Sequence, residues 1–329
     1  MSGAAAPSAT EREHLADQLL PRHRGPISLA GSAMDAQERQ LVVILADISG
    51  YTRFMLENQT AALHGQGCIT ILIETLLREV NIPLQLQEIE GDALFLYAAH
   101  PGDEAGWRDV LAQVRIKLPR FFEAFFAGMV PIAEATPCGC AICKNVDQLK
   151  LKVIVHLGRA VFHTIAGRPQ ISGADVILAH RLLKNSQPNR EYLLMTEPAY
   201  QELGRGMDAD FEAGVEGCDG FGSVKIHVQR LDGAVERERS SFYALPPAEF
   251  ASRVRGYARL VASSGLRMLA EYVRQPTVAV GWPRRVGFAL AQLLISPFYL
   301  FYIMLVQPGR LRARHAAELR ARSRDGAAA

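Results

Sequence analysis

The sequence predicts an α+β fold, because short apolar stretches typical of strands alternate with longer segments of helical periodicity. The apolar run at residues 41–47 predicts a strand that is buried on both faces. Residues 52–80 have the apolar spacing of a helix with one buried face. Two further apolar stretches, 84–89 and 93–98, are joined by Glu90-Gly91-Asp92, and this combination predicts a hairpin.

The following segments complete the arrangement. Residues 103–128 predict a second amphipathic helix, and the stretch LKLKVIVHLGRAVF at 149–162 predicts a pair of strands. A turn and a helix are expected at 171–185, a strand at 190–196 and two more strands within 220–245. The order strand–helix–strand–strand–helix–strand is the ferredoxin-like βαββαβ arrangement, here with extra C-terminal strands.

Composition divides the chain into further segments. Apolar residues make up 49% and charged residues 21% of the chain, which predicts a packed core. The net charge of +2 does not point to nucleic acid, and we expect none as a partner. We expect a flexible tail at 1–37, a folded domain at 38–245 with a Cys-rich loop at 136–148, a basic amphipathic helix at 246–280, a hydrophobic membrane anchor at 281–309 and a basic tail at 310–329.

The anchor is predicted from the segment 286–306, which has no charged residue over 21 positions. This length is sufficient, because about 20 apolar residues span a bilayer. Arginines flank both ends and favour the cytoplasmic side for each, and Pro297 would kink a helix. A re-entrant anchor, a tilted span and a buried core helix therefore all stay open. The sequence shows no signal peptide, and its five cysteines, an odd number, do not resemble the disulfide framework of a secreted protein. We therefore expect a membrane-associated protein on the cytoplasmic side of a bacterial membrane.

Two carboxylates are candidate metal ligands. Asp47 ends the first strand and Asp92 lies in the hairpin turn, and the first and third strands are neighbours in this fold, so the two can meet at one sheet edge. Mg²⁺ takes one or two carboxylates and completes its shell with water and phosphates, as two-metal phosphoryl transfer requires. Backbone N–H groups of Ile48, Ser49 and Gly50 are candidates to bind a triphosphate. The alternative is that Asp47 is a helix cap and Asp92 a turn residue.

Four motifs in this order resemble those of the class III nucleotide cyclase catalytic domain: ADISGYTRF, EIEGDALFLY, VIVHLGRAVF and ISGADVILAHRLL. The resemblance covers residues 40–205, and the Cys-rich loop together with HRLLKN points to an uncharacterised bacterial branch. It implies a homodimer with active sites at the interface. Such a dimer converts a nucleoside triphosphate to a cyclic 3′,5′-monophosphate and pyrophosphate with two Mg²⁺ or Mn²⁺ ions per site.

The resemblance also assigns roles to residues. Asp47 and Asp92 match the two metal-binding aspartates, with Ile48 beside them in the metal site. Arg181 matches the arginine that stabilises the transition state, a role that suits a guanidinium facing phosphoryl charge. A solvated helix-surface charge is the alternative for Arg181. His156 matches a structural histidine of the family.

The base- and ribose-recognising positions depart from the family. Glu88 stands where adenylate cyclases carry Lys and guanylate cyclases carry Glu, and Gln170 stands where they carry Asp and Cys, respectively. A carboxylate accepts hydrogen bonds from guanine, and Gln can bind either base, so the pair argues against ATP without establishing GTP. The alternative for Glu88 is a solvated strand residue. Ile177 replaces the ribose-orienting Asn, and losing such a contact costs orders of magnitude in rate. A catalytically silent nucleotide-binding or dimerisation module is therefore the alternative function.

The loop cysteines Cys138, Cys140 and Cys143 place three thiols within six residues. Three thiolates bind a structural Zn²⁺ if one more ligand completes the tetrahedron, and His156, His163 or a cysteine of a second subunit are the candidates. The alternatives are three reduced cysteines or redox-sensitive thiols. The last of these would make the chain a thiol-based sensor.

Overall fold

The computed structural model of the chain describes residues 36–57, 62–135, 145–165, 167–188, 191–256, 283, 286, 287, 290, 301, 302 and 305–325. The chain forms two compact units, one of residues 1–37 with 162–170 and one of residues 38–161 with 171–329. The larger unit contains the helices named below, most of the sheet and the candidate site.

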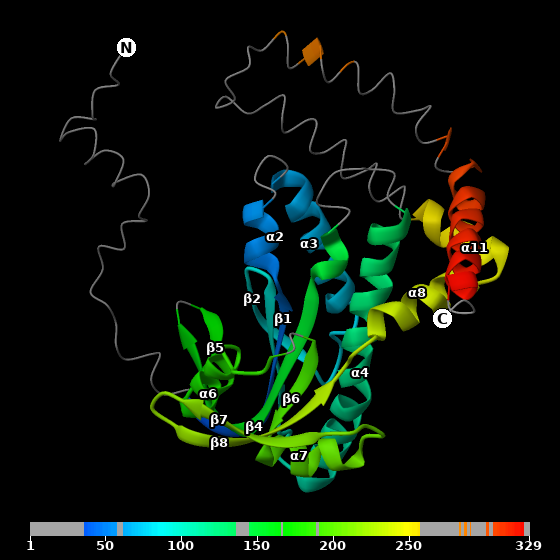
Figure 1. Cartoon of the computed structure of the whole chain (residues 1–329). Coiled ribbons are helices and arrows are strands. Elements are labelled where there is room, and N and C mark those ends of the chain that lie inside the picture. The colour runs from blue at the N-terminus through cyan, green and yellow to red at the C-terminus, as the bar shows by residue number, and fades with distance from the viewer. Residues whose placement is uncertain are drawn as a thin grey trace, which may run out of the picture. The chain divides into compact units, whose positions relative to one another are not determined.

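Within the described residues, eight strands form one mixed sheet (Figure 1). The strands are β1 (Gln37–Ser49), β2 (Gln85–Glu90), β3 (Ala93–Ala99), β4 (Lys150–Ile165), β5 (Arg168–Ser172), β6 (Tyr192–Thr196), β7 (Glu212–Cys218) and β8 (Gly222–Arg230). Their order is β2-β3-β1-β4-β6-β8-β7, and β5 pairs with β4. β1 and β3 are antiparallel neighbours, as the sequence predicts, whereas β4 and β6 are parallel.

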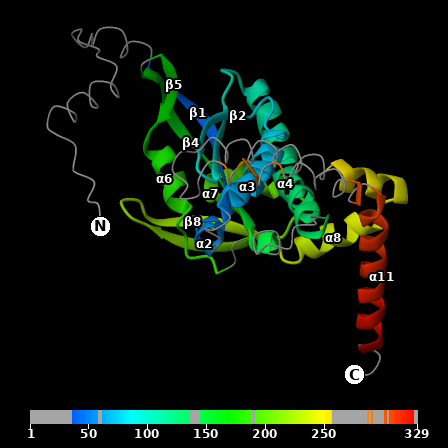
Figure 2. The same ribbon diagram turned by 90° about the horizontal axis from the view of Figure 1, so that it is seen from above.

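Several helices accompany the sheet. They are α2 (Tyr51–Glu57), α3 (Ala62–Leu77), α4 (Glu104–Ala135), α6 (Ala174–Leu182), α7 (Glu197–Glu202), α8 (Ala234–Ala244) and α11 (Gln307–Asp325), with short 3₁₀ turns at Val146–Gln148 and Gly204–Gly206. α3 and α4 lie side by side along the sheet (Figures 1 and 2). Their aromatic and aliphatic side chains share one core with alternate residues of β1, namely Val42, Ile44, Ala46 and Ile48, because side chains alternate between the faces of a strand.

The prediction of an α+β fold is confirmed, and so is the element order from β1 to β4. Two local predictions are wrong. Residues 150–162 lie in a single long strand, β4, and not in a pair of strands, because Gly158 stays within the strand and makes room for the side chain of Asp175. Of the two strands predicted within 220–245, only β8 is found, and α8 follows it because Val235 and Phe242 have helical spacing and both are buried.

Several predictions fall on residues that the structure does not describe. These are the tail at 1–35, the candidate zinc ligands Cys138, Cys140 and Cys143, and most of the predicted anchor. In the described part of the chain, no helix has both the length and the apolar character that crossing a bilayer requires. In the same part, Cys68 and Cys218 are free and buried.

Candidate active site

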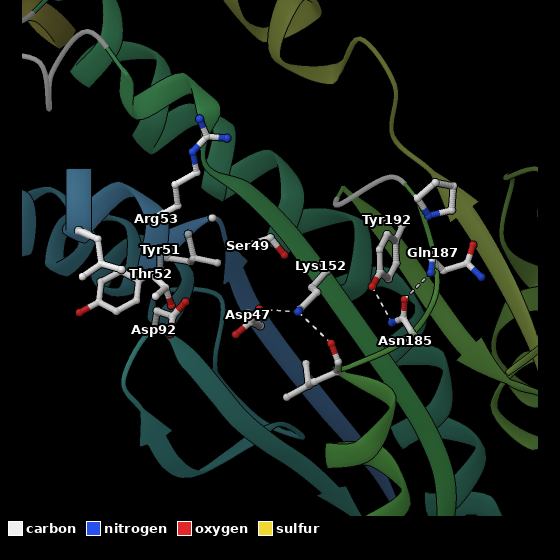
Figure 3. A pocket seen from close by; sticks show the side chains of 15 residues that line it. Asp47, Ser49, Tyr51, Thr52, Arg53, Asp92, Lys152, Asn185, Gln187 and Tyr192 are labelled. Carbon is white, nitrogen blue, oxygen red and sulfur yellow. Dashed lines mark hydrogen bonds and ion pairs between the residues drawn. The ribbon is translucent and has the colours of Figure 1, made fainter. Parts of the chain in front are cut away.

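A row of polar side chains crosses four neighbouring strands at one edge of the sheet. Asp92 immediately precedes β3, Asp47 lies near the end of β1, Lys152 lies on β4 and Tyr192 begins β6. Asp47 is paired with Ala93 across the β1–β3 ladder, and Lys152 is paired with Tyr192 across the β4–β6 ladder. Strand order thus brings together residues that are far apart in the sequence (Figure 3).

The two aspartates lie close enough to affect each other's charge. The backbone N–H of Ile48 donates to the carbonyl oxygen of Asp92 at 3.3 Å, which ties the end of β1 to the hairpin turn. Burial, and next the negative charge of Asp47, raise the pKa of Asp92 to about 6. Among the described residues, no cationic side chain forms an ion pair with Asp92. Its carboxylate is therefore poorly compensated in the folded chain.

Lys152 is a site residue that the sequence analysis did not single out. Its Nζ lies 2.9 Å from Asp47 Oδ2 and donates a second hydrogen bond to the carbonyl oxygen of Leu183 at 3.0 Å (Figure 3). The side chains of Lys152 and Asp47 are 18% and 17% exposed. The available signal was the alternation in LKLKV, which places Lys150 and Lys152 on one face of a strand.

The wall opposite the aspartates is a fixed polar network. Asn185 Nδ2 donates to the hydroxyl oxygen of Tyr192 at 2.6 Å and to the carbonyl oxygen of Leu182 at 2.7 Å. The backbone N–H of Gln187 donates to Asn185 Oδ1 at 3.0 Å. Burial raises the pKa of the Tyr192 phenol, so this hydroxyl keeps its proton at neutral pH and remains a hydrogen-bond donor.

The aspartates on one side and this polar network on the other line an open cavity of about 900 Å³. Ser49 and Gly50 form the turn from β1 into α2, where Gly50 adopts a positive φ of 93° that favours glycine. The lining residues are Asp47, Ile48, Ser49, Gly50, Tyr51, Thr52, Arg53, Leu56, Asp92, Lys152, Leu183, Asn185, Gln187, Pro188 and Tyr192. The cavity has the size of a small-molecule site, and polar groups line both of its walls.

Other predicted site residues do not line this cavity. Arg181 is exposed on α6, with its Cζ 6.0 Å from the centroid of the Phe221 ring, and Ile177 one turn earlier is 51% exposed. Glu88 is exposed on β2, and Gln170 lies on β5 and belongs to the smaller unit. The aspartates and the turn at 48–50 are thus brought together within one chain, whereas the predicted base, ribose and transition-state contacts are not.

His156 has the environment of a structural residue. Its Nδ1 lies 2.8 Å from Thr196 Oγ1, and its Nε2 lies 3.4 Å from Asp175 Oδ1. Burial lowers the pKa of His156, while the neighbouring Asp175 carboxylate opposes this shift. The imidazole connects β4, β6 and α6 and does not line the cavity.

The two carboxylates suit a hard divalent cation. Mg²⁺ is commonly held by one or two carboxylates together with water and substrate phosphates, and Asp47 and Asp92 provide that number. In the described part of the chain, no three His, Cys, Asp or Glu side chains gather as a fuller metal cluster would require. A cation between the aspartates would also relieve the repulsion that raises the pKa of Asp92.

Comparisons with known proteins give the following relationships. A family model described as a protein of unknown function (DUF2652) matches residues 69–192. The uncharacterized protein Rv2561/Rv2562 of Mycobacterium tuberculosis is 32% identical over 144 residues, which are 44% of this chain and 65% of the relative. The chain thus spans slightly less than two thirds of the length of this relative.

Solved structures similar to the chain include adenylyl and guanylyl cyclases. The adenylyl cyclase CyaB from P. aeruginosa is 16% identical, with a TM-score of 0.43 over 60% of this chain and 97% of that one. The guanylyl cyclase Cya2 is 13% identical, with a TM-score of 0.46 over 59% and 93%. The guanylate cyclase domain of RhGC from Catenaria anguillulae in complex with GTP is 13% identical, with a TM-score of 0.41 over 59% and 100%. What the cavity of this chain does has to be derived from its own residues.

Proposed function

We propose that the protein binds a nucleoside triphosphate with Mg²⁺ or Mn²⁺ and, as a homodimer, converts it to a cyclic 3′,5′-monophosphate and pyrophosphate. The observation that carries this proposal is the row of Asp92, Asp47 and Lys152 along a cavity of about 900 Å³. Carboxylates for a divalent cation beside a positively charged side chain for phosphate oxygens are the combination that phosphoryl transfer uses.

The metal ligands in this proposal are Asp47 and Asp92, with the backbone of Ile48 beside them. A bound divalent cation would neutralise phosphate charge and favour deprotonation of the attacking hydroxyl. Lys152 and Arg53 line the same cavity and supply positive charge for the triphosphate. The two aspartates repel a polyanion, so a metal ion bound between them would strengthen the binding of an anionic ligand.

The reaction requires one bond to form and one to break. The 3′-oxygen of the ribose attacks the α-phosphorus, the bond from that phosphorus to the oxygen bridging to the β-phosphorus breaks, and pyrophosphate leaves. The hydroxyl proton passes to solvent. Arg181 would stabilise charge on the α-phosphate. Since it does not line the cavity of its own chain, a second subunit would have to supply it.

The proposed dimer supplies the remaining contacts in the same way. Glu88 and Ile177 are exposed and, like Gln170, lie outside the cavity of their own chain, so the proposal places them opposite the cavity of the partner. Glu88 and Gln170 would contact the base. We leave the base open between guanine and others, because Gln serves either kind.

A catalytically silent nucleotide-binding or dimerisation module is the second candidate. Ile177 favours it, because an exposed apolar side chain cannot orient a ribose hydroxyl. Such a module would keep the cation and triphosphate contacts of the cavity and form no product.

We further propose that residues 286–306 attach the protein to the cytoplasmic face of a bacterial membrane. The support is the lack of charge over 21 positions, followed by the arginine-rich helix α11. Recovery of the full chain in the soluble fraction of a lysate prepared without detergent would contradict this proposal.

The experiment that tests the proposed reaction incubates the purified chain with each of the four nucleoside triphosphates and Mn²⁺. Cyclic nucleotide is measured for the wild type, for Asp47→Asn and for Asp109→Asn, whose exposed carboxylate lies on α4 away from the cavity. We expect product from the wild type and Asp109→Asn, and almost none from Asp47→Asn. Nucleotide binding without product would select the silent module, and neither binding nor product would exclude both.

A further inference from the structure

Lys152 occupies an unusual position for a residue beside a metal site. Its Nζ lies 2.9 Å from an oxygen of Asp47, the carboxylate that the proposed function assigns to the metal ion. The carbonyl oxygen of Leu183 holds the same ammonium group at 3.0 Å from another side (Figure 3). Both partners of the ion pair are more than four-fifths buried, so water screens their attraction less than on an open surface.

This ion pair and a divalent cation compete for one group. A metal ion that binds Asp47 Oδ2 would meet the positive charge of Lys152 within hydrogen-bond distance of the same oxygen, and like charges so close repel strongly. The ion pair therefore makes Asp47 a poorer metal ligand as long as the ammonium group stays in place. Asp92 forms no ion pair among the described residues, and Lys152 compensates its charge only from a greater distance.

A polyanion would change this balance. Lys152 lines the cavity on the same side as the aspartates, so phosphate oxygens entering the cavity offer its ammonium group an alternative acceptor. The long, flexible stem of a lysine allows its charge to move between neighbouring acceptors. Movement of the ammonium group away from Asp47 would free the carboxylate and remove the repulsion at the same time.

We propose that Lys152 is a built-in competitor of the divalent cation for Asp47, which a triphosphate displaces, so that metal and triphosphate bind interdependently. The inference rests on the proposed function and adds a regulated order to it. The chain without nucleotide binds the metal ion weakly, and the entering triphosphate makes the metal site available.

The same strand contains a matched control. Lys150 lies two residues earlier on β4, and its Nζ forms an ion pair of 3.7 Å with Glu191 Oε2. Neither residue lines the cavity in the described part of the chain. Lys150→Met thus removes a lysine from a carboxylate on the same strand without touching the proposed metal ligands.

The test measures binding of Mn²⁺ alone to the full chain through the signal of free Mn²⁺ in electron paramagnetic resonance. Lys152→Met removes the charge, and Lys152→Gln removes the charge while keeping a donor for the Leu183 carbonyl. We expect both variants to bind Mn²⁺ about tenfold or more tightly than the wild type and Lys150→Met. Calorimetry with inorganic tripolyphosphate without metal should show the opposite sign, with about tenfold weaker binding in the Lys152 variants.

Changes of opposite sign in the Mn²⁺ and tripolyphosphate affinities distinguish competition from a structural role, because a loosened strand would weaken the binding of both ligands. Equal Mn²⁺ affinity in the wild type and both Lys152 variants, in a chain that still forms cyclic product, would overturn the inference and leave the proposed function intact. Failure of all variants to bind Mn²⁺ or tripolyphosphate, with no product formed, would overturn the proposed function and this inference with it.

Discussion

Asp175 of α6 lies so close to Gly158 of β4 that a β-carbon on the glycine would overlap Asp175 Oδ2 and lie 2.7 Å from its Cβ. The same carboxylate accepts a hydrogen bond from the backbone N–H of Arg159 at 2.6 Å. Its other oxygen lies 3.4 Å from His156 Nε2. These contacts fix the first turn of α6 on β4, and α6 is the helix that presents Arg181.

Replacement of Gly158 by Ala should therefore destabilise the chain. The added methyl group would push Asp175 away and loosen its bonds to Arg159 and His156, and such overpacking costs about 1–3 kcal/mol in the free energy of unfolding. Urea unfolding checks this against Gly217→Ala in β7, where a β-carbon would have no atom within 4 Å. Equal stability of the two variants would show that α6 moves aside at little cost.

Glu191 should make stability depend on pH in a defined direction. Burial raises the pKa of Glu191 to about 6, while Lys150 opposes the shift, so the folded chain holds this proton more tightly than the unfolded chain does. The resulting stability is complete below the unfolded pKa of 4.5 and is lost as the pH rises through about 6. The loss is about 2 kcal/mol in the free energy of unfolding.

Urea unfolding at pH 4.5 and pH 7.5 checks this prediction with Glu191→Gln, which cannot titrate. The wild type should lose about 2 kcal/mol relative to the variant between the two pH values. Glu74→Gln, which removes an exposed carboxylate of α3, controls for the general effect of charge. A difference between wild type and Glu191→Gln that is the same at both pH values would mean that burial of Glu191 does not govern its proton.

Mixing inactive variants should restore activity if two chains share each site. Asp47 lines the cavity and Arg181 does not, so the proposed dimer takes one from each subunit. Asp47→Asn and Arg181→Ala should each form almost no cyclic product, and an equal mixture should regain about a quarter of wild-type activity, since half the dimers contain one intact site.

The control for this experiment mixes two variants whose changed residues lie in the same cavity of one subunit. Asp47→Asn with Asp92→Asn should stay inactive, because both lesions fall in the same set of ligands and no intact site can form. Full activity of Arg181→Ala alone would instead support a solvated role for this arginine beside Phe221.

The convergence of Asp47 and Asp92 was predictable from the sequence because it follows from strand order alone. Asp47 near the end of one strand and a hairpin turn that contains Asp92 must meet once β1 and β3 pair. Lys152 was not predictable in the same way. In LKLKV it has the pattern of any polar strand face, and only the sheet order, which places β4 beside β1, brings it to Asp47.

The errors within the fold have a similar origin. The stretch LKLKVIVHLGRAVF predicted a pair of strands, but it belongs to one strand, in which Gly158 makes room for Asp175 of a later helix. Two strands were expected within 220–245, and the helix at 234–244 becomes evident only when Val235 and Phe242 are seen to reach the shared core. Contacts between distant segments decide both cases, and local periodicity does not contain them.

Replacement of Ile177 by Asn should raise the rate of product formation. Ile177 is 51% exposed near the start of α6, so an amide there costs little stability and gives the proposed dimer a group that can orient a ribose hydroxyl. An orienting contact of this kind is worth about tenfold or more in kcat. Mn²⁺ binding should not change, because Ile177 lies outside the cavity that contains the proposed metal ligands. Ile116→Asn, which alters a 57% exposed isoleucine of α4, is the matched control and should leave the rate unchanged. If both variants form product at the wild-type rate, another group orients the ribose. The presence of Ile177 in place of the family's Asn would then be no argument against cyclase activity.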